Sequence, residues 1–131
     1  ANSLGNLGNA YDSLGQYREA IELHQQDLEI SREIGDRGGE ASSLNNLGNG
    51  YESLGQYREA IELHQQSLEI KREIGDRKGE ANSLFNMGKA LAQLDQKWEA
   101  QSSYQAAKAI YTELDLPHIV AKCDAVLENL G

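Results

Sequence analysis

The sequence predicts an all-α protein in which helical hairpins stack into a solenoid, and an internal repeat carries this prediction. Residues 1–40 and 41–80 align without a gap and differ at only seven positions, so 33 of their 40 positions are identical. Residues 81–120 continue the same register with 12 identities to the second block. Each block contains two helical patterns, and no run of β-branched residues indicates a strand.

The first helical pattern of each block has one apolar face. In the first block this face consists of Leu4, Leu7, Tyr11 and Leu14. Glycine readily adopts the left-handed conformation that ends a helix, so four glycines are expected to close the helices. They are Gly15 and Gly55 after the first helices, and Gly35 and Gly75 after the second helices. Asp36 and Asp76 follow as the expected N-caps of the next helix.

The second helix of the first block, expected over residues 17–34, has two apolar stripes. One stripe consists of Tyr17, Ala20, Ile21, His24 and Leu28, and the other of Leu23, Ile30 and Ile34. One stripe can pack on the first helix of the same block, whereas the other needs a neighbouring block. A single hairpin could not bury both stripes, so the units are expected to stack.

Glycines also lie inside the first helical patterns. Gly8, Gly48 and Gly88 recur at a spacing of 40 residues. Phosphate-binding glycines stand between a strand and a helix, and no strand pattern precedes these three. A glycine inside a helix costs roughly 1 kcal/mol relative to alanine, which is tolerated where another helix must approach closely. We therefore predict close helix packing, and no phosphate site, at these glycines.

The C-terminal segment predicts a capping helix. After the only proline, Pro117, an apolar stripe consists of Ile119, Val120, Cys123, Val126, Leu127 and Leu130. A terminal helix with a polar outer face is how solenoids end. The expected organisation is one domain over residues 1–131, with repeats at 1–40, 41–80 and 81–116 and a capping helix at 117–131. No cap precedes the first block, which suggests a fragment of a longer array or an engineered, idealised one.

The repeat resembles the tetratricopeptide repeat (TPR). The residues that carry the resemblance are Leu4-x-x-Leu7-Gly8-x-x-Tyr11, Gly15-x-Tyr17-x-x-Ala20 and Leu28, with counterparts in the later blocks. The period of 40 residues exceeds the usual ~34. In this longer repeat the sequence is similar to Partner of Inscuteable scaffolds, kinesin light chains and bacterial arrays of the same subtype. The resemblance implies a right-handed solenoid that binds other proteins. Asp27 and Ser67 depart from the alanine usual at their position.

Charge and composition exclude several functional classes. The formal net charge of −9 would repel nucleic acids and anionic membranes, so a neutral or basic partner is favoured. No apolar run approaches the roughly 18 residues of a membrane span, and no signal-peptide pattern opens the sequence. The single cysteine, Cys123, cannot form an internal disulfide. We expect a cytoplasmic protein that binds neither nucleic acid nor membranes.

No residue pattern supports catalysis. His24 and His64 lie in a packing stripe, one per repeat, and no helix places two metal ligands four residues apart. Cys123 is expected to be a buried thiol, because it lies on the apolar stripe of the capping helix. We therefore expect no enzymatic activity, no cofactor and no metal site. Trp98 is expected to be partly packed at the start of a helix, and His118 to face solvent.

The asparagines give the sharpest functional signal. Eight of nine lie in the first helices of the repeats, although asparagine is a poor helix former. Its amide offers donors and acceptors suited to an extended main chain, and in the similar families such residues line the concave groove. The expected groove residues are Asn2, Asn6, Asn9 and Ser13, then Asn46, Asn49 and Ser53, and finally Asn82, Asn86, Lys89 and Gln93. Duplication of a neutral surface is the alternative explanation, although Asn86 persists in the diverged third block.

We therefore expect a protein–protein interaction module that binds an extended peptide in its concave groove. Asp12 and Glu52 at one rim would favour a basic peptide residue, and Lys89 an acidic one near the C-terminal end of the groove. The alternative is a structural or idealised repeat scaffold that self-associates through its open N-terminal end.

Overall fold

The computed structural model describes residues 15–130, and this part of the chain folds into six α-helices without a strand. The helices are α2 (Tyr17–Ile34), α3 (Arg37–Ser53), α4 (Tyr57–Ile74), α5 (Arg77–Gln93), α6 (Lys97–Glu113) and α7 (Pro117–Asn129). The predicted second helix over residues 17–34 is confirmed. The expected first helix, with Asn2, Asn6, Asn9, Asp12 and Ser13, lies outside the described residues.

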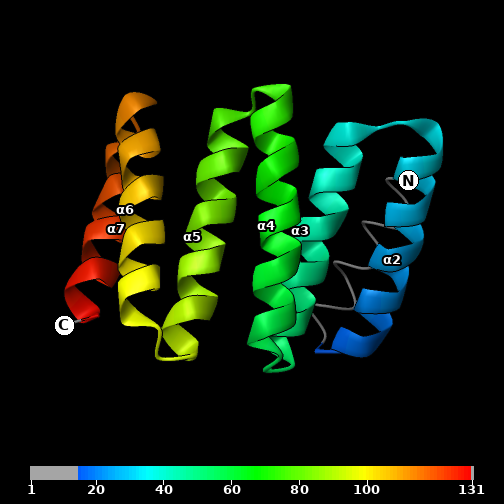
Figure 1. Ribbon diagram of the computed structural model, residues 1–131, viewed down its shortest axis with the longest axis horizontal. Coiled ribbons are helices and arrows are strands. Elements are labelled where there is room, and N and C mark those ends of the chain that lie inside the picture. The colour runs from blue at the N-terminus through cyan, green and yellow to red at the C-terminus, as the bar shows by residue number, and fades with distance from the viewer. Residues whose placement is uncertain (1–14, 131) are drawn as a thin grey trace.

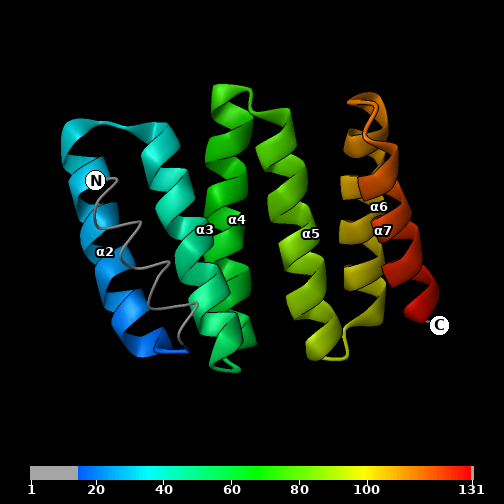
Figure 2. The same ribbon diagram turned by 180° about the vertical axis from the view of Figure 1, so that it is seen from behind.

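The helices follow one another in a row, in chain order, from α2 to α7 (Figures 1 and 2). Each helix packs chiefly against the one before it and the one after it. The first helices α3 and α5 of two neighbouring units also touch each other. This arrangement confirms the predicted all-α solenoid of stacked helical hairpins.

The turns between units form as the glycine pattern predicts. Gly35 and Gly75 adopt the left-handed conformation, with φ of 74° and 76°. The carboxylates of Asp36 and Asp76 then accept hydrogen bonds from backbone N–H groups three residues on, each at 2.9 Å. In the third unit Asp115 stands at the position of Gly75, and Asp95 at that of Gly55, which is also left-handed; both aspartates keep that conformation. Aspartate tolerates that conformation better than most residues do, so the turn geometry outlasts the glycine.

The two described interior glycines permit close helix contact, as predicted. A Cβ atom at Gly48 would lie 2.7 Å from the ring of His64, and one at Gly88 would lie 2.8 Å from the ring of Tyr104. His64 and Tyr104 occupy the same position of successive second helices and are buried. Each glycine therefore receives a ring from the second helix of its own hairpin. Gly8 lies outside the described residues.

The second apolar stripe is covered across units for most of its length, but the expectation is wrong for its last residue, because Ile34 and its counterpart Ile74 are exposed at the helix ends. One core cluster joins Ile21 and Leu28 of α2, Leu44 of α3 and Ile70 of α4, with Leu63 of α4 packed against it. Leu63 and Ile70 are the counterparts of Leu23 and Ile30 in the first unit. The stripe that a single hairpin leaves uncovered is thus covered by the preceding unit, which is the physical basis of the stacking.

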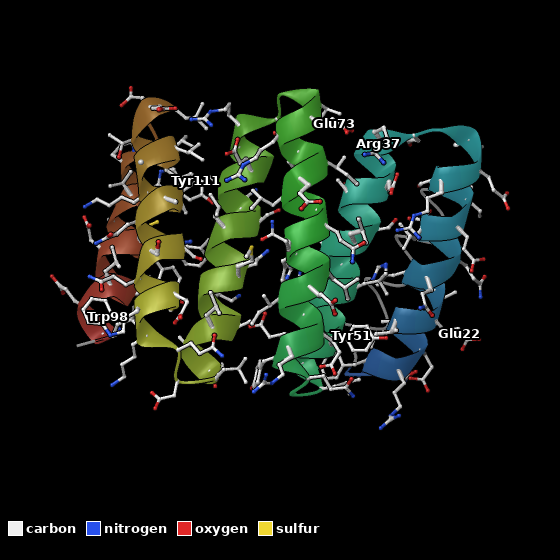
Figure 3. All side chains as sticks on the ribbon, in the orientation of Figure 1. Glu22, Arg37, Tyr51, Glu73, Trp98 and Tyr111 are labelled. Carbon is white, nitrogen blue, oxygen red and sulfur yellow. The ribbon has the colours of Figure 1, made fainter. Side chains whose placement is uncertain are left out.

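An ion-pair ladder links the start of each first helix, α3 or α5, to the end of the second helix of its own hairpin. Arg37 of α3 contacts Glu73 of α4 at 2.7 Å, and Arg77 of α5 pairs in the same way with Glu113 of α6 (Figure 3). The arginine of each rung also holds a buried glutamate one turn along its own helix. No sequence pattern indicated that these acids bind arginines 36 positions earlier in the chain.

Replacing Gly48 with alanine is expected to lower the free energy of unfolding by roughly 1–3 kcal/mol, because the new methyl group would overlap the His64 ring. Urea denaturation measures this change. Gly38→Ala in the same helix is the matched control, since its Cβ would meet nothing closer than 3.7 Å. Alanine is the better helix former, so that variant should keep or gain stability. Equal losses in both variants would contradict the close-approach explanation.

Candidate functional site

The described groove residues gather between α3 and α5. Two recesses lie along this seam, which we call the α3–α5 seam. The first recess is lined by Asn49, Glu52, Ser53, Tyr57, Asn86, Lys89 and Gln93. The second is lined by Ser42, Asn45, Asn46, Lys71, Gly79, Asn82 and Ser83. Every groove residue expected in the described part of the chain thus lines one of the two recesses.

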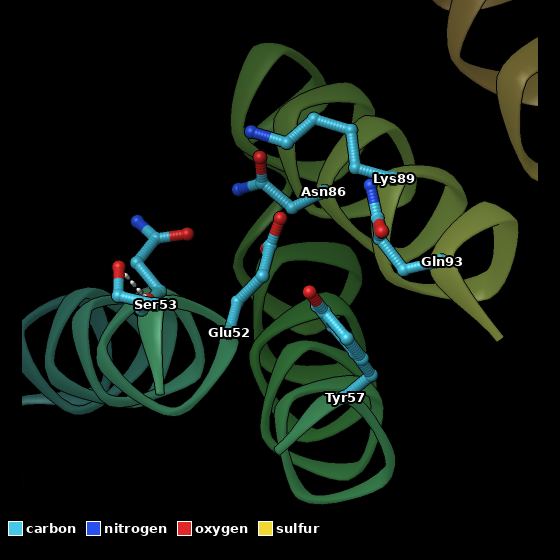
Figure 4. A pocket seen from close by; sticks show the side chains of 7 residues that line it. Glu52, Ser53, Tyr57, Asn86, Lys89 and Gln93 are labelled. Atoms are coloured by element: carbon cyan, nitrogen blue, oxygen red, sulfur yellow. Dashed lines mark hydrogen bonds between the residues drawn. The ribbon is translucent and has the colours of Figure 1, made fainter. Parts of the chain in front are cut away.

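Stacking explains why these side chains meet. α3 and α5 are equivalent first helices 40 residues apart, and their buried faces pack on α4 and α6. The polar faces of the two first helices therefore lie side by side. In the first recess Glu52, Tyr57, Asn86 and Lys89 extend into a common space (Figure 4) of about 340 Å³. A recess of this size accommodates one or two amino-acid side chains.

Hydrogen bonds within the chain occupy some of the predicted groove residues. The side-chain N–H group of Asn86 donates to Oδ1 of Asn45 at 3.0 Å, which joins α5 to α3. Oδ1 of Asn82 accepts a hydrogen bond from the Tyr111 hydroxyl. Sequence reasoning missed Asn45, although it is one of the eight asparagines of the first helices. Two of the expected groove residues, Asn82 and Asn86, therefore make structural hydrogen bonds in addition to any role in binding.

Other groove side chains remain available. Within residues 15–130, the side chains of Asn46, Asn49 and Gln93 have no hydrogen-bond partner. Ser53 donates only to the carbonyl of Asn49, at 3.1 Å. Lys89 is exposed and is in no ion pair of the described part. The seam therefore offers amide donors and acceptors, and one ammonium group, to a ligand.

Glu52 is the unusual charge of the first recess. Its Oε2 atom is buried and has no hydrogen-bond partner among the described residues. Burial raises the pKa of Glu52, and the Lys89 ammonium opposes this increase. The expectation that Glu52 and Lys89 serve different parts of the groove is wrong, because both line one recess. Glu52 and Lys89 are 37 positions apart, which is nearly one repeat, so stacking brings them together.

His64 and Cys123 are buried and His118 faces solvent, as predicted. His64 is fully buried, and burial lowers its pKa to about 4, with the positive charge of Lys89 adding to the effect. Burial likewise raises the pKa of the Cys123 thiol. His118 is exposed. In the part of the chain that the structure describes, no group of three or more His, Cys, Asp or Glu side chains could hold a metal ion.

The expectation for Trp98 is wrong. Its side chain is 83% exposed at the start of α6, where partial packing was expected (Figure 3). α5 and α7 both pack on α6, but neither covers the indole. The indole borders a recess with Leu127 and Leu130 of α7.

Comparison with known proteins establishes the family. A family model described as tetratricopeptide repeat matches residues 1–73 and also residues 39–113. These matches cover most of the chain, so the protein belongs to the tetratricopeptide repeat family. None of the helices in residues 15–130 is both long enough and apolar enough to cross a membrane.

Individual relatives match in different ways. A segment of 35 residues is 54% identical to G-protein-signaling modulator 1 of Mus musculus, and it covers 27% of this chain but only 5% of that protein. A kinesin-light-chain-like structure from Podosopora anserina, with nearly identical TPR-like repeats, superposes with a TM-score of 0.83 at 23% identity. The superposition covers 98% of this chain and 64% of the kinesin-light-chain-like chain.

A second solved structure is PcrH in complex with the chaperone binding region of PopD. It superposes with a TM-score of 0.79 at 21% identity, over 98% of this chain and 89% of the PcrH chain. At these identities the likeness of both structures shows a common fold.

The pKa of His64 generates a pH prediction. The folded value of about 4 lies below the ordinary 6.5, so the unfolded chain binds more protons between these values. Stability is therefore expected to fall as the pH drops from about 6.5 to about 4, by roughly 3 kcal/mol from this group. The measurement is the free energy of unfolding in urea across this range.

His64→Tyr is the matched variant, because Tyr104 occupies the same position in the third unit and packs on Gly88. Burial also raises the pKa of Glu52, so the informative quantity is the difference between the two proteins. The variant should lose less stability on acidification. Parallel pH profiles would show that His64 is not the responsible group.

Proposed function

We propose that the protein is a protein–protein interaction module that binds an extended segment of a partner along the α3–α5 seam. The single observation that carries this proposal is the concentration of polar side chains in the two recesses of the seam. Four of them, Asn46, Asn49, Lys89 and Gln93, have no hydrogen-bond or ion-pair partner among the described residues. Amides such as those of Asn46 and Asn49 can donate to and accept from a peptide main chain. The proposal is binding without catalysis and without a cofactor.

The electrostatics of the seam favour a particular kind of segment. Glu52 has a buried oxygen without a donor, and Lys89 presents an exposed ammonium group to the same recess. A segment with both basic and acidic groups close together matches this pair. The net charge of −9 further favours a partner that is neutral or basic as a whole.

The comparisons support this proposal at the level of the fold. PcrH, which has the same fold, is bound to a region of PopD in its solved structure. The family match extends over both helices of every unit that forms the seam. The cytoplasmic location expected from the sequence belongs to the same proposal.

The alternative is a structural role, and one contact favours it. The hydrogen bond between Asn86 and Asn45 joins two first helices, which gives Asn86 a reason to persist without a ligand. Self-association through the N-terminal end is the other form of this alternative. The first-block residues that would test it lie outside the described part.

The binding proposal is tested with a peptide selected from a random display library on the immobilised protein. Replacing Asn46, Asn49 and Asn86 with alanine is expected to weaken binding of that peptide by about 1 kcal/mol per lost hydrogen bond, which is roughly a fivefold loss of affinity for each. Titration calorimetry measures the affinities. Gln66→Ala with Gln105→Ala removes two exposed amides of the second helices and should leave affinity unchanged. Undiminished affinity in the triple variant would remove the seam as the binding surface.

A double-mutant cycle separates the structural role of Asn86 from its role in binding. Asn45→Ala and Asn86→Ala are expected to share a coupling energy of roughly 0.5–1.5 kcal/mol in urea unfolding, because each removes the same hydrogen bond. Additive effects on stability would mean that the bond contributes nothing to folding. Asn86 would then be free for a ligand.

A further inference from the structure

A second surface lies at the C-terminal end of the solenoid, away from the α3–α5 seam. Its recess has a volume of about 340 Å³ and is lined by Lys97, Trp98, Gln101, Leu127 and Leu130, which we call the C-terminal recess. Trp98 is the most exposed of the large apolar side chains in residues 15–130, at 83%. Lys97 forms no ion pair in that part of the chain.

The repeat register shows what kind of surface this is. α3, α5 and α7 begin at residues 37, 77 and 117, at intervals of one repeat. The surface that α6 and α7 present to solvent is therefore equivalent to the one that α2 and α3 present to α4. In that earlier position Leu63 and Ile70 of α4 pack against the cluster of α2 and α3. The same kind of surface is thus a helix-binding interface inside this molecule.

The half of this surface nearer the C-terminal end of α6 is polar, whereas the equivalent surface of α2 and α3 is apolar. Lys108 of α6 contacts Asp124 of α7 at 2.6 Å. These two residues stand at the repeat positions of Leu28 and Leu44, which belong to one buried cluster. An apolar side chain at the position of Ile70 would have to cover this ion pair, at a desolvation cost. A second copy of the chain, which offers Ile30 at that position, is a poor fit.

The other half of this surface, near the start of α6, carries apolar side chains that the earlier units lack. Trp98 stands where α2 and α4 have arginine, at positions 18 and 58. Leu130 stands where α3 has Gly50, whose Cβ would lie 2.8 Å from Ile21. Gln101 replaces that isoleucine. α6 and α7 thus depart from α2 and α3 by adding an indole and one leucine beside Leu127, whose counterpart Leu47 is already apolar.

We infer that the C-terminal recess binds a short amphipathic helix of another protein, in the place that the next second helix would take. The helix carries an apolar residue against Trp98, Leu127 and Leu130, and an acidic residue in its first turns against the unpaired Lys97. It continues with a polar residue over Lys108 and Asp124. α4 supplies the pattern, because Glu59, Glu62 and Leu63 face the equivalent surface of α2 and α3. This inference is independent of the α3–α5 seam.

The test uses a synthetic peptide with the sequence of α4, residues 57–74, in which Ile70 is replaced by glutamine to match the polar half. Trp98 is the only tryptophan of the chain, and the peptide contains none, so intrinsic fluorescence reports directly on the recess. Titration is expected to give a saturable blue shift of the Trp98 emission. The unmodified peptide, with Ile70, should bind at least several-fold more weakly.

Variants locate the binding. Leu127→Asp should abolish the shift, whereas Ile34→Asp, which changes another exposed apolar residue at the far end, should not. Trp98→Arg restores the residue of the first two units at an exposed position and should keep the fold. Anisotropy of a labelled peptide should then show at least tenfold weaker binding, with unchanged thermal unfolding by circular dichroism as the control.

Three outcomes would overturn the inference. The first is the absence of any shift up to millimolar peptide. The second is equal binding to wild type and Trp98→Arg. The third is a dimer in sedimentation that Trp98→Arg abolishes, together with preference for the unmodified peptide. That result would make a second copy the occupant of the recess.

Discussion

Each second helix carries two apolar stripes, and its own hairpin can cover only one of them. The other stripe, represented by Leu63 and Ile70 in α4, finds its partners on the preceding unit. Burying such side chains is worth roughly 1.5–3 kcal/mol each, so the units cannot stand apart without losing much of their stability. Stacking is therefore a condition of folding, and the surfaces of the solenoid follow from it.

The seam between α3 and α5 is one such consequence. Because α4 packs against both α3 and α5, the polar faces of these two first helices come together, and Glu52 and Lys89 line one recess. The same contact joins Asn45 to Asn86. One set of amides thus connects adjacent units and also lines the recesses, so support of the solenoid and recognition of a ligand share side chains.

The surface of α6 and α7 differs from the equivalent surfaces of the earlier helices. α7 covers α6, and its Cys123 joins the core cluster of the last hairpin. The surface beyond α7 would need another second helix if it were built like the earlier ones. The ion pair between Lys108 and Asp124 makes half of that surface compatible with water. The other half, around Trp98, stays apolar and exposed.

The sequence by itself determined the repeat, the helices and their turns. Gly75 ends α4 and Asp76 caps α5 through contacts within a few residues, and such local effects are legible in one dimension. Packing of His64 and a close helix approach at Gly48 were each predicted from the sequence, but only the structure shows that the two meet. Only the tertiary structure decided which polar side chains meet across units, as in the contact of Asn45 with Asn86. These contacts depend on the angle and offset between stacked hairpins, which the 40-residue period does not specify, and the exposure of Trp98 was missed because it depends on which neighbouring helices are present.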